Sequence, residues 1–206
     1  MELFRPKTRN TALFIALLAV LTALTTVATI IIAIPFPTSS GYLNFGDALV
    51  MLSGLLLGPL GGFFAGGVGS AMGDVTLGFL QFAPITFVVK GCEGMIVGLV
   101  SRQVGMINRL TKLDIVGLAA ASLVMMFGYF IGEIFLFLLL DFTFLVALGA
   151  AFAELTTLNW IQVTAGSIIT AVVGPAIRGF LRDYIYELEP SDSWIGDDVQ
   201  TPKDFT

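Results

Sequence analysis

The chain has 206 residues, of which 56% are hydrophobic and only 12% are charged, and its mean hydropathy is +0.94. A soluble domain of similar length carries about 25% charged residues. So much apolar surface cannot be buried inside one domain of this size, so the composition excludes a soluble protein and predicts that the lipid bilayer is its solvent. A single cysteine, Cys92, excludes a disulfide framework.

The first apolar segment follows three basic residues and covers Thr11–Ala33. A spanning helix needs about 20 apolar residues, so this segment is long enough to cross the bilayer. We therefore expect a retained first helix and no cleavable signal. Alanines repeat along it at helical spacing and form a flat face that suits either internal packing or the helix of a partner. These alanines are Ala12, Ala16, Ala19 and Ala23.

Five more apolar segments follow in the chain. They are Gly46–Leu57, Leu60–Thr76, Pro84–Ser101, Asp114–Leu140 and roughly Leu155–Leu181. Gly58 and Pro59 separate the first two of them, because proline lacks an N–H group and restricts the residue before it. This pair can form two spans, which we favour, or one re-entrant hairpin. Glycines spaced by four residues between Gly62 and Gly73 predict close helix packing.

The basic residues orient these segments. Six crossings place nine of the ten Lys and Arg residues on one side, and the loops predicted on the other side, 34–45, 75–83 and 141–154, contain none. That side is cytoplasmic by the positive-inside rule. The nine residues are Arg5, Lys7, Arg9, Arg102, Arg109, Lys112, Arg178, Arg182 and Lys203. The sequence therefore predicts an all-α integral membrane protein, a compact bundle of six transmembrane helices with both termini in the cytoplasm.

The domain organisation is one transmembrane domain and a tail. Residues 1–186 form the six-helix domain in this prediction. The last twenty residues, 187–206, hold six acidic residues and one lysine, which accounts for the whole net charge of −5. We expect this segment to be a disordered cytoplasmic tail. No basic or aromatic-interleaved stretch indicates a nucleic-acid partner.

Polar residues inside the predicted helices are costly in a membrane and mark functional sites. At 1.5 Å per residue they lie at similar depth in the outer half of the bilayer. Each helix also presents them on one face, as expected of a pocket that opens to the outside. They are Lys90, Glu93, Tyr129, Glu133, Asn159 and Gln162. The alternative is that Lys90 neutralises Glu93 or Glu133 in a purely structural ion pair.

Two aspartates flank the second and third segments. Asp47 follows Asn44, Phe45 and Gly46 near a helix start, where a short polar side chain is usually a cap, so we predict a cap. For Asp74, a cap and a functional role are equally open.

The residue types exclude most enzymes. There is no histidine, which rules out histidine-based acid–base, nucleophilic and metal sites. No Gly-x-Ser-x-Gly elbow and no Walker A lysine loop is present, so the chain cannot hydrolyse ATP. The sequence predicts a protein that is not an enzyme and that carries no cofactor or metal.

Several motifs between Tyr42 and Arg102 occur in a distinctive order. They are Tyr42-Leu-Asn-Phe-Gly-Asp47, Leu57-Gly-Pro-Leu-Gly-Gly62, Gly66-Gly-Val-Gly69, Gly73-Asp74 and Lys90-Gly-Cys-Glu-Gly94. In these residues the chain resembles the substrate-binding S components of energy-coupling factor (ECF) transporters, most of all the riboflavin-type branch. The motif order is specific to this superfamily and much less so to a substrate.

The resemblance implies a function. Such proteins are six-helix bundles of prokaryotic cell membranes that bind a vitamin from outside and associate with a transmembrane T subunit and two cytoplasmic ATPases. Their helix-one Ala-x-x-x-Ala motif, used against the T subunit, matches the alanine face of Ala12 to Ala23. The acidic tail is not part of the family pattern. The residues expected to hold a planar heterocycle such as riboflavin are Asn44, Lys90, Glu93, Tyr129, Glu133, Asn159, Trp160 and Gln162.

Two other functions remain open from the residues alone. A solitary secondary transporter could use Lys90, Glu93 and Glu133 as a proton relay, although no inverted repeat is detectable. A non-transporting membrane scaffold could use the glycine faces for assembly, although polar groups at one depth argue against it.

Overall fold

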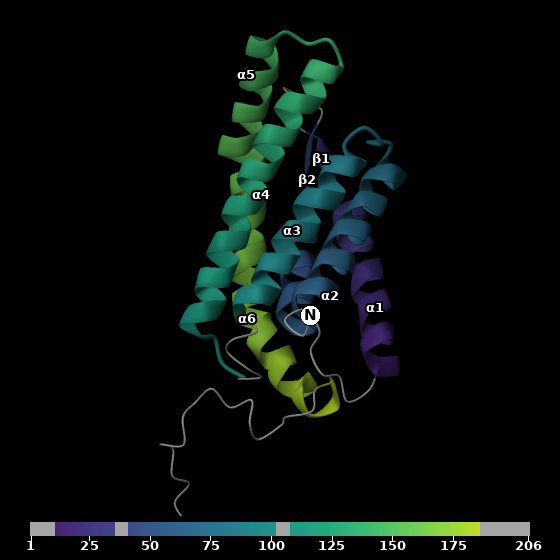
Figure 1. The fold of residues 1–206 in the computed structure, drawn as a ribbon, viewed down its shortest axis with the longest axis vertical. Helices are drawn as coiled ribbons and strands as arrows, with labels where there is room; N and C mark the ends of the chain where they lie inside the picture. The colour runs from purple at the N-terminus through teal and green to yellow at the C-terminus, as the bar shows by residue number, and fades with distance from the viewer. Residues whose placement is uncertain (1–10, 36–40, 102–107, 186–206) are drawn as a thin grey trace, which may run out of the picture.

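The computed structural model describes residues 11–35, 41–101 and 108–185, and side chains as far as Leu181. Within these ranges the protein is a helix bundle (Figure 1). Its helices are α1 (Thr11–Ile31), α2 (Gly46–Leu77), α3 (Ala83–Ser101), α4 (Lys112–Leu139), α5 (Phe144–Glu154) and α6 (Trp160–Ile185). A π-helix, Leu155–Asn159, joins α5 to α6, and two short antiparallel strands, β1 (Ile34–Pro35) and β2 (Tyr42–Leu43), precede α2.

Five helices in the described ranges are long and apolar enough to span a membrane, with Phe144–Leu181 counted as one. The predicted all-α membrane fold is confirmed. The six complete crossings and the cytoplasmic location of both termini stay predictions. All three basic residues at the amino terminus, Arg102 and the predicted tail lie outside the described residues.

Helix α2 is folded back on itself at Gly58. The backbone of Gly58 has φ 74° and ψ −171°, a conformation essentially restricted to glycine, and Pro59 follows it. A Cβ atom built on Gly62 would lie 2.6 Å from the Cα of Gly54. Eight residues in a straight helix span about 12 Å, so residues 46–57 and 59–77 form two arms that lie against each other. These arms match the second and third predicted segments and bring Asp47 and Asp74 to the same end.

The predicted glycine packing joins these arms to α3 and α1. A Cβ atom on Gly54 or Gly62 would collide with the carbonyl oxygen of Gly94 in α3. On the other side, the Thr26 hydroxyl of α1 donates to the Gly69 carbonyl at 2.9 Å. Small residues therefore let three helices approach to backbone contact.

The prediction that 141–154 is an external loop is wrong. Only Asp141, Phe142 and Thr143 separate α4 from α5, and Phe144–Glu154 is helical. The segment lacks basic residues because it is apolar helix, rich in alanine and leucine, and not because it is an outside loop. Figure 1 shows the α4–α5 turn extending beyond the ends of α2 and α3.

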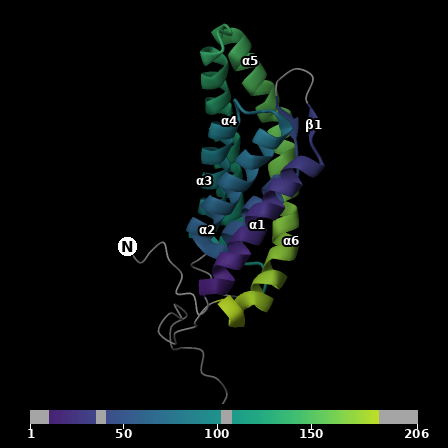
Figure 2. The ribbon, with the colours of Figure 1, turned by 90° about the vertical axis from the view of Figure 1, so that its right-hand side faces the viewer.

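A buried clamp ties α4 to α6 at the other end of the bundle. The guanidinium of Arg178 donates to both carboxylate oxygens of Asp114, at 2.7 and 2.9 Å, and to the carbonyl of Arg109 at 3.1 Å. Thr111 and Asp114 form a capping box at the start of α4. This end also holds the start of α1 and the end of α6 (Figure 2). The described residues that predicted the cytoplasmic side therefore share one end of the molecule.

Candidate functional site

A cavity lies at the opposite end, between the end of α1, both ends of α2, the start of α3, the end of α4 and the π-helix. Six of the eight predicted site residues line it. The full lining is Thr29, Gly41, Tyr42, Asn44, Ser70, Asp74, Phe82, Thr86, Lys90, Tyr129, Glu133, Glu154, Asn159 and Gln162. Its volume is about 40 Å³, which is room for water but not for a vitamin.

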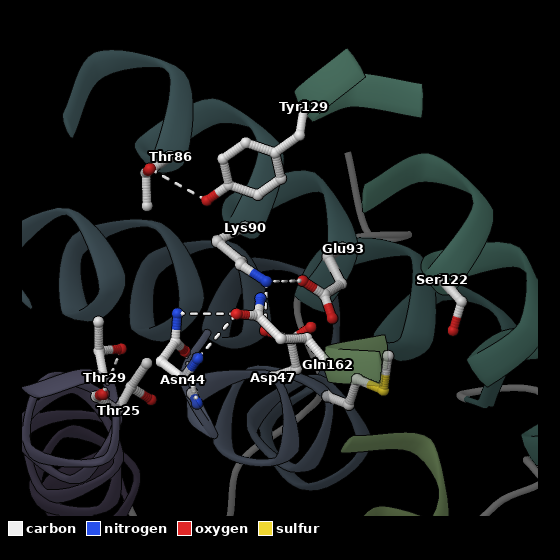
Figure 3. A network of polar contacts seen from close by, with 12 residues as sticks. Thr25, Thr29, Asn44, Asp47, Thr86, Lys90, Glu93, Ser122, Tyr129 and Gln162 are labelled. Atoms are coloured by element: carbon white, nitrogen blue, oxygen red, sulfur yellow. Dashed lines mark hydrogen bonds and ion pairs between the residues drawn. The ribbon is translucent and has the colours of Figure 1, made fainter. Parts of the chain in front are cut away.

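Lys90 lies at the floor of the cavity and is 2% exposed. Its ammonium pairs with Asp47 and, at 3.2 Å, with Glu93, and it lies 5.5 Å from the centre of the Tyr129 ring (Figure 3). The prediction that Asp47 is a helix cap is wrong: its side chain is fully buried against Lys90. Lys90 reaches Asp47 because glycines let the two arms of α2 pack against α3 in backbone contact.

Asn44 and Gln162 connect the start of α2 to α6. The backbone N–H of Asn44 donates to the Gln162 side-chain oxygen at 2.7 Å, and the Asn44 amide donates to the same oxygen at 3.4 Å. The Asn44 oxygen accepts from the N–H of Gly46 at 2.8 Å. Asn44, and not Asp47, therefore provides a hydrogen-bond acceptor for a backbone N–H group at the start of α2. Gln162 therefore has a structural role as well as a place in the lining.

Tyr42 of β2 closes one side of the cavity. Its hydroxyl donates to Asp74 at 2.5 Å and its ring stacks on Phe79 with centroids 4.9 Å apart. Burial, and then the neighbouring Asp74 carboxylate, raise the pKa of the Tyr42 phenol, which keeps it a proton donor. Tyr129 makes a similar contact deeper in the bundle, where its hydroxyl donates to Thr86 at 3.0 Å.

Glu133 and Glu154 meet on the far wall. Glu133 is in α4 and 1% exposed, and Glu154 is the last residue of α5 and 4% exposed. The two carboxyl groups lie side by side. The π-helix after Glu154 widens the turn, so both Glu154 and Asn159 face the cavity.

Several buried polar atoms of the lining have no hydrogen-bond partner among the described residues. They are Asp74 Oδ2, Ser70 Oγ, Glu133 Oε2, Glu154 Oε1 and Asn159 Nδ2. A buried polar group without a partner costs about 1–3 kcal/mol, and native proteins seldom leave several together. The arrangement therefore suits a polar ligand or ordered water.

Two predicted site residues lie outside the lining. Trp160 is 58% exposed on the bundle surface, and Glu93 is buried behind Lys90. Sequence reasoning left the role of Asp74 undecided and placed Glu154 in a loop. The Gly58–Pro59 pair is the sequence signal that could have placed Asp74 in the site, because the chain folds back there and returns to the end of the bundle that holds Asp47. Among the described residues no group of three or more Cys, Asp or Glu side chains is arranged to hold a metal ion.

Comparison with known proteins shows the fold and the family of the chain. A solved S component for biotin from an ECF-type ABC transporter superposes with a TM-score of 0.57 over 84% of this chain and 92% of its own, at 18% identity, which shows a shared fold. An uncharacterized protein of Pyrococcus woesei, from the gap 3′ region, is 47% identical over 104 residues, which are 50% of this chain and 67% of that protein. The family model for the S component of the ECF-type riboflavin transporter matches residues 9–178. The chain is a multi-pass prokaryotic membrane protein and belongs to this S-component family.

Proposed function

We propose that this chain is the high-affinity binding subunit of an ECF importer and captures a B vitamin or related planar heterocycle from outside the cell. The observation that carries the proposal is the set of unpartnered, buried polar atoms that converge on an aromatic-lined cavity. Riboflavin is the first ligand to test, because the matching family is described by it.

The cavity is too small for a vitamin in this structure, so ligand entry requires it to widen. The contacts of Tyr42 with Asp74 and of Asn44 with Gln162 hold the segment before α2 over the cavity. A ligand that replaces these hydrogen bonds with its own would compensate for their loss.

Native mass spectrometry of the detergent-purified protein tests the binding role. We expect a retained molecule with the mass of a B vitamin or related heterocycle, and displacement or binding of added riboflavin at submicromolar concentration. A protein that retains nothing and binds no B vitamin would contradict the proposal. Uptake by proteoliposomes that contain this chain alone, driven by a proton gradient, would instead support a solitary secondary transporter.

We also propose that α1 binds a T subunit, which works with two cytoplasmic ATPases. The four alanines of the predicted face, Ala12, Ala16, Ala19 and Ala23, are all exposed, so they are free to meet another helix. Bulk at this face would keep the helices apart. Ala16→Trp should therefore abolish vitamin uptake in cells and leave ligand binding by the purified protein unchanged.

Ile15→Trp is the matched control, because Ile15 is 59% exposed and points about 100° away around the helix. It should leave both uptake and co-purification of the ATPases intact. Loss of ligand binding in Ala16→Trp would place the alanine face in internal packing and contradict the interface.

A further inference from the structure

Three carboxyl groups line the cavity without a cationic side chain of their own. Asp74, Glu133 and Glu154 are 3%, 1% and 4% exposed, and one oxygen of each lacks a hydrogen-bond partner among the described residues. They come from three different helices, so the cluster is built by the tertiary fold and not by one acidic stretch.

The only lysine or arginine in the described lining is already paired with carboxylates of the protein. Lys90 pairs with both Asp47 and Glu93, two carboxylates for one ammonium. Its charge is thus offset before the three lining carboxyl groups are considered. Glu133 and Glu154 are hydrogen-bonded to each other, which requires a proton on one of them, so the pair adds one negative charge to that of Asp74. The cavity therefore has an excess of negative charge.

The remaining lining suits a flat ring. Phe82 and Tyr129 bring aromatic rings to the cavity, and Tyr42 closes it from above. The faces of aromatic rings carry negative potential and attract cations as well as other rings. Asn159 adds an amide with an unpartnered N–H group, which can donate a hydrogen bond to an acceptor atom of the same ligand.

We infer that the ligand is a cationic nitrogen heterocycle that presents its charge and N–H donors to Asp74 and to the Glu133–Glu154 pair. This inference rests on the proposed function and narrows the ligand within it. A metal ion is a poorer match, because no group of three metal-ligating side chains is present in the described part of the chain.

Calorimetric titration of the detergent-purified protein separates the charge classes. The probes are two cations, thiamine and 1-methylnicotinamide, the neutral riboflavin and the anionic biotin, all at one pH and ionic strength. We expect at least one cation to bind tenfold or more tightly than both riboflavin and biotin. If riboflavin or biotin binds most tightly, the vitamin-binding function stands and the cationic class is wrong. If no probe binds, the cationic class is contradicted, and the mass spectrometry described above decides the vitamin-binding function.

Removing one charge provides the second test. Asp74→Asn keeps the shape of the side chain and an oxygen for Tyr42, and it should weaken binding of the cation by about ten- to a hundredfold, the range for a hydrogen bond to a charged group. Asp141→Asn removes a charge from the exposed α4–α5 turn and should change nothing. The double variant Glu133→Gln/Glu154→Gln removes the charge of the pair and repeats the test if the first variant unfolds. Unchanged cation binding in either folded variant would overturn the inference.

Discussion

Asn159 offers the cleanest single-residue test of the cavity. Its side-chain Nδ2 has no hydrogen-bond partner in the described structure, although the residue is only 5% exposed. Asn159→Ala therefore removes an N–H group that a ligand would use and that makes no hydrogen bond within the described structure. We expect ligand affinity to fall by about ten- to a hundredfold, with the midpoint of thermal unfolding nearly unchanged. Titration and a melting curve of the same preparation measure both.

Gln162→Ala is the informative contrast. Gln162 accepts the backbone N–H of Asn44, so its removal leaves a buried donor unpaired, at a cost of about 1–3 kcal/mol. This variant should lose stability as well as affinity. If Asn159→Ala binds the identified ligand as tightly as the parent, the polar cluster serves packing and the proposed site is wrong.

Lys90 is expected to matter for stability first. Lys90→Met would leave Asp47 and Glu93 as a buried pair of carboxylates with no ammonium between them. Breaking a buried ion pair by removing one partner costs about 3–5 kcal/mol. We expect a large fall in the thermal midpoint of the detergent-solubilised protein. Lys112→Met removes an exposed lysine and should have little effect. Equal midpoints for the two variants would contradict a structural role for Lys90.

At the scale of helices, α2 and α3 depend on glycine. A Cβ atom on Gly94 would collide with the backbone of Gly62, where no rotamer change can relieve the overlap. Gly94→Ala should therefore separate the helices and destabilise the protein by more than 1 kcal/mol, despite the gain in helix propensity. Gly149→Ala in α5 meets no atom within 4 Å and should be neutral or stabilising. Thermal midpoints of the two variants measure the difference, and a neutral Gly94→Ala would contradict the close packing.

Local signals predicted much of the fold. Apolar length placed α1, α3 and α4, and Gly58 with Pro59 marked the point where α2 folds back. Helix α5 was missed altogether because an absence of basic residues has two causes, an outside loop or a continuing apolar helix. Sequence alone does not separate these.

The site was predicted in part because depth along a helix follows from counting residues. Six of the eight residues chosen at similar depth line one cavity. Rotation about a helix axis is less certain, and Trp160 therefore lies on the outer surface. Glu154 was missed because the π-helix that turns it inward has no recognised sequence signal. Asp47 was taken for a cap because its partner, Lys90, is 43 residues away in sequence.

For the whole molecule, orientation in the membrane is the property that function depends on most. The cavity lies at the end opposite Arg109, Lys112 and Arg178, so the positive-inside rule predicts that it faces the outside. We expect Thr143→Cys, in the α4–α5 turn, to react with a membrane-impermeant maleimide in intact cells. Lys112→Cys, at the start of α4, should react only after permeabilisation. Both changes are made in a Cys92→Ser background, because Cys92 is the one native thiol.

The control is the Cys92→Ser protein itself, which should take up no label and should still bind ligand. Both engineered positions are exposed in the structure, so a difference in labelling reports their side of the membrane and not their burial within the bundle. Labelling of Lys112→Cys in intact cells, with Thr143→Cys protected, would reverse the orientation. The cavity would then open to the cytoplasm, where an importer releases its substrate, and the proposed capture of a vitamin from outside would have to be abandoned even though the family and the fold remained.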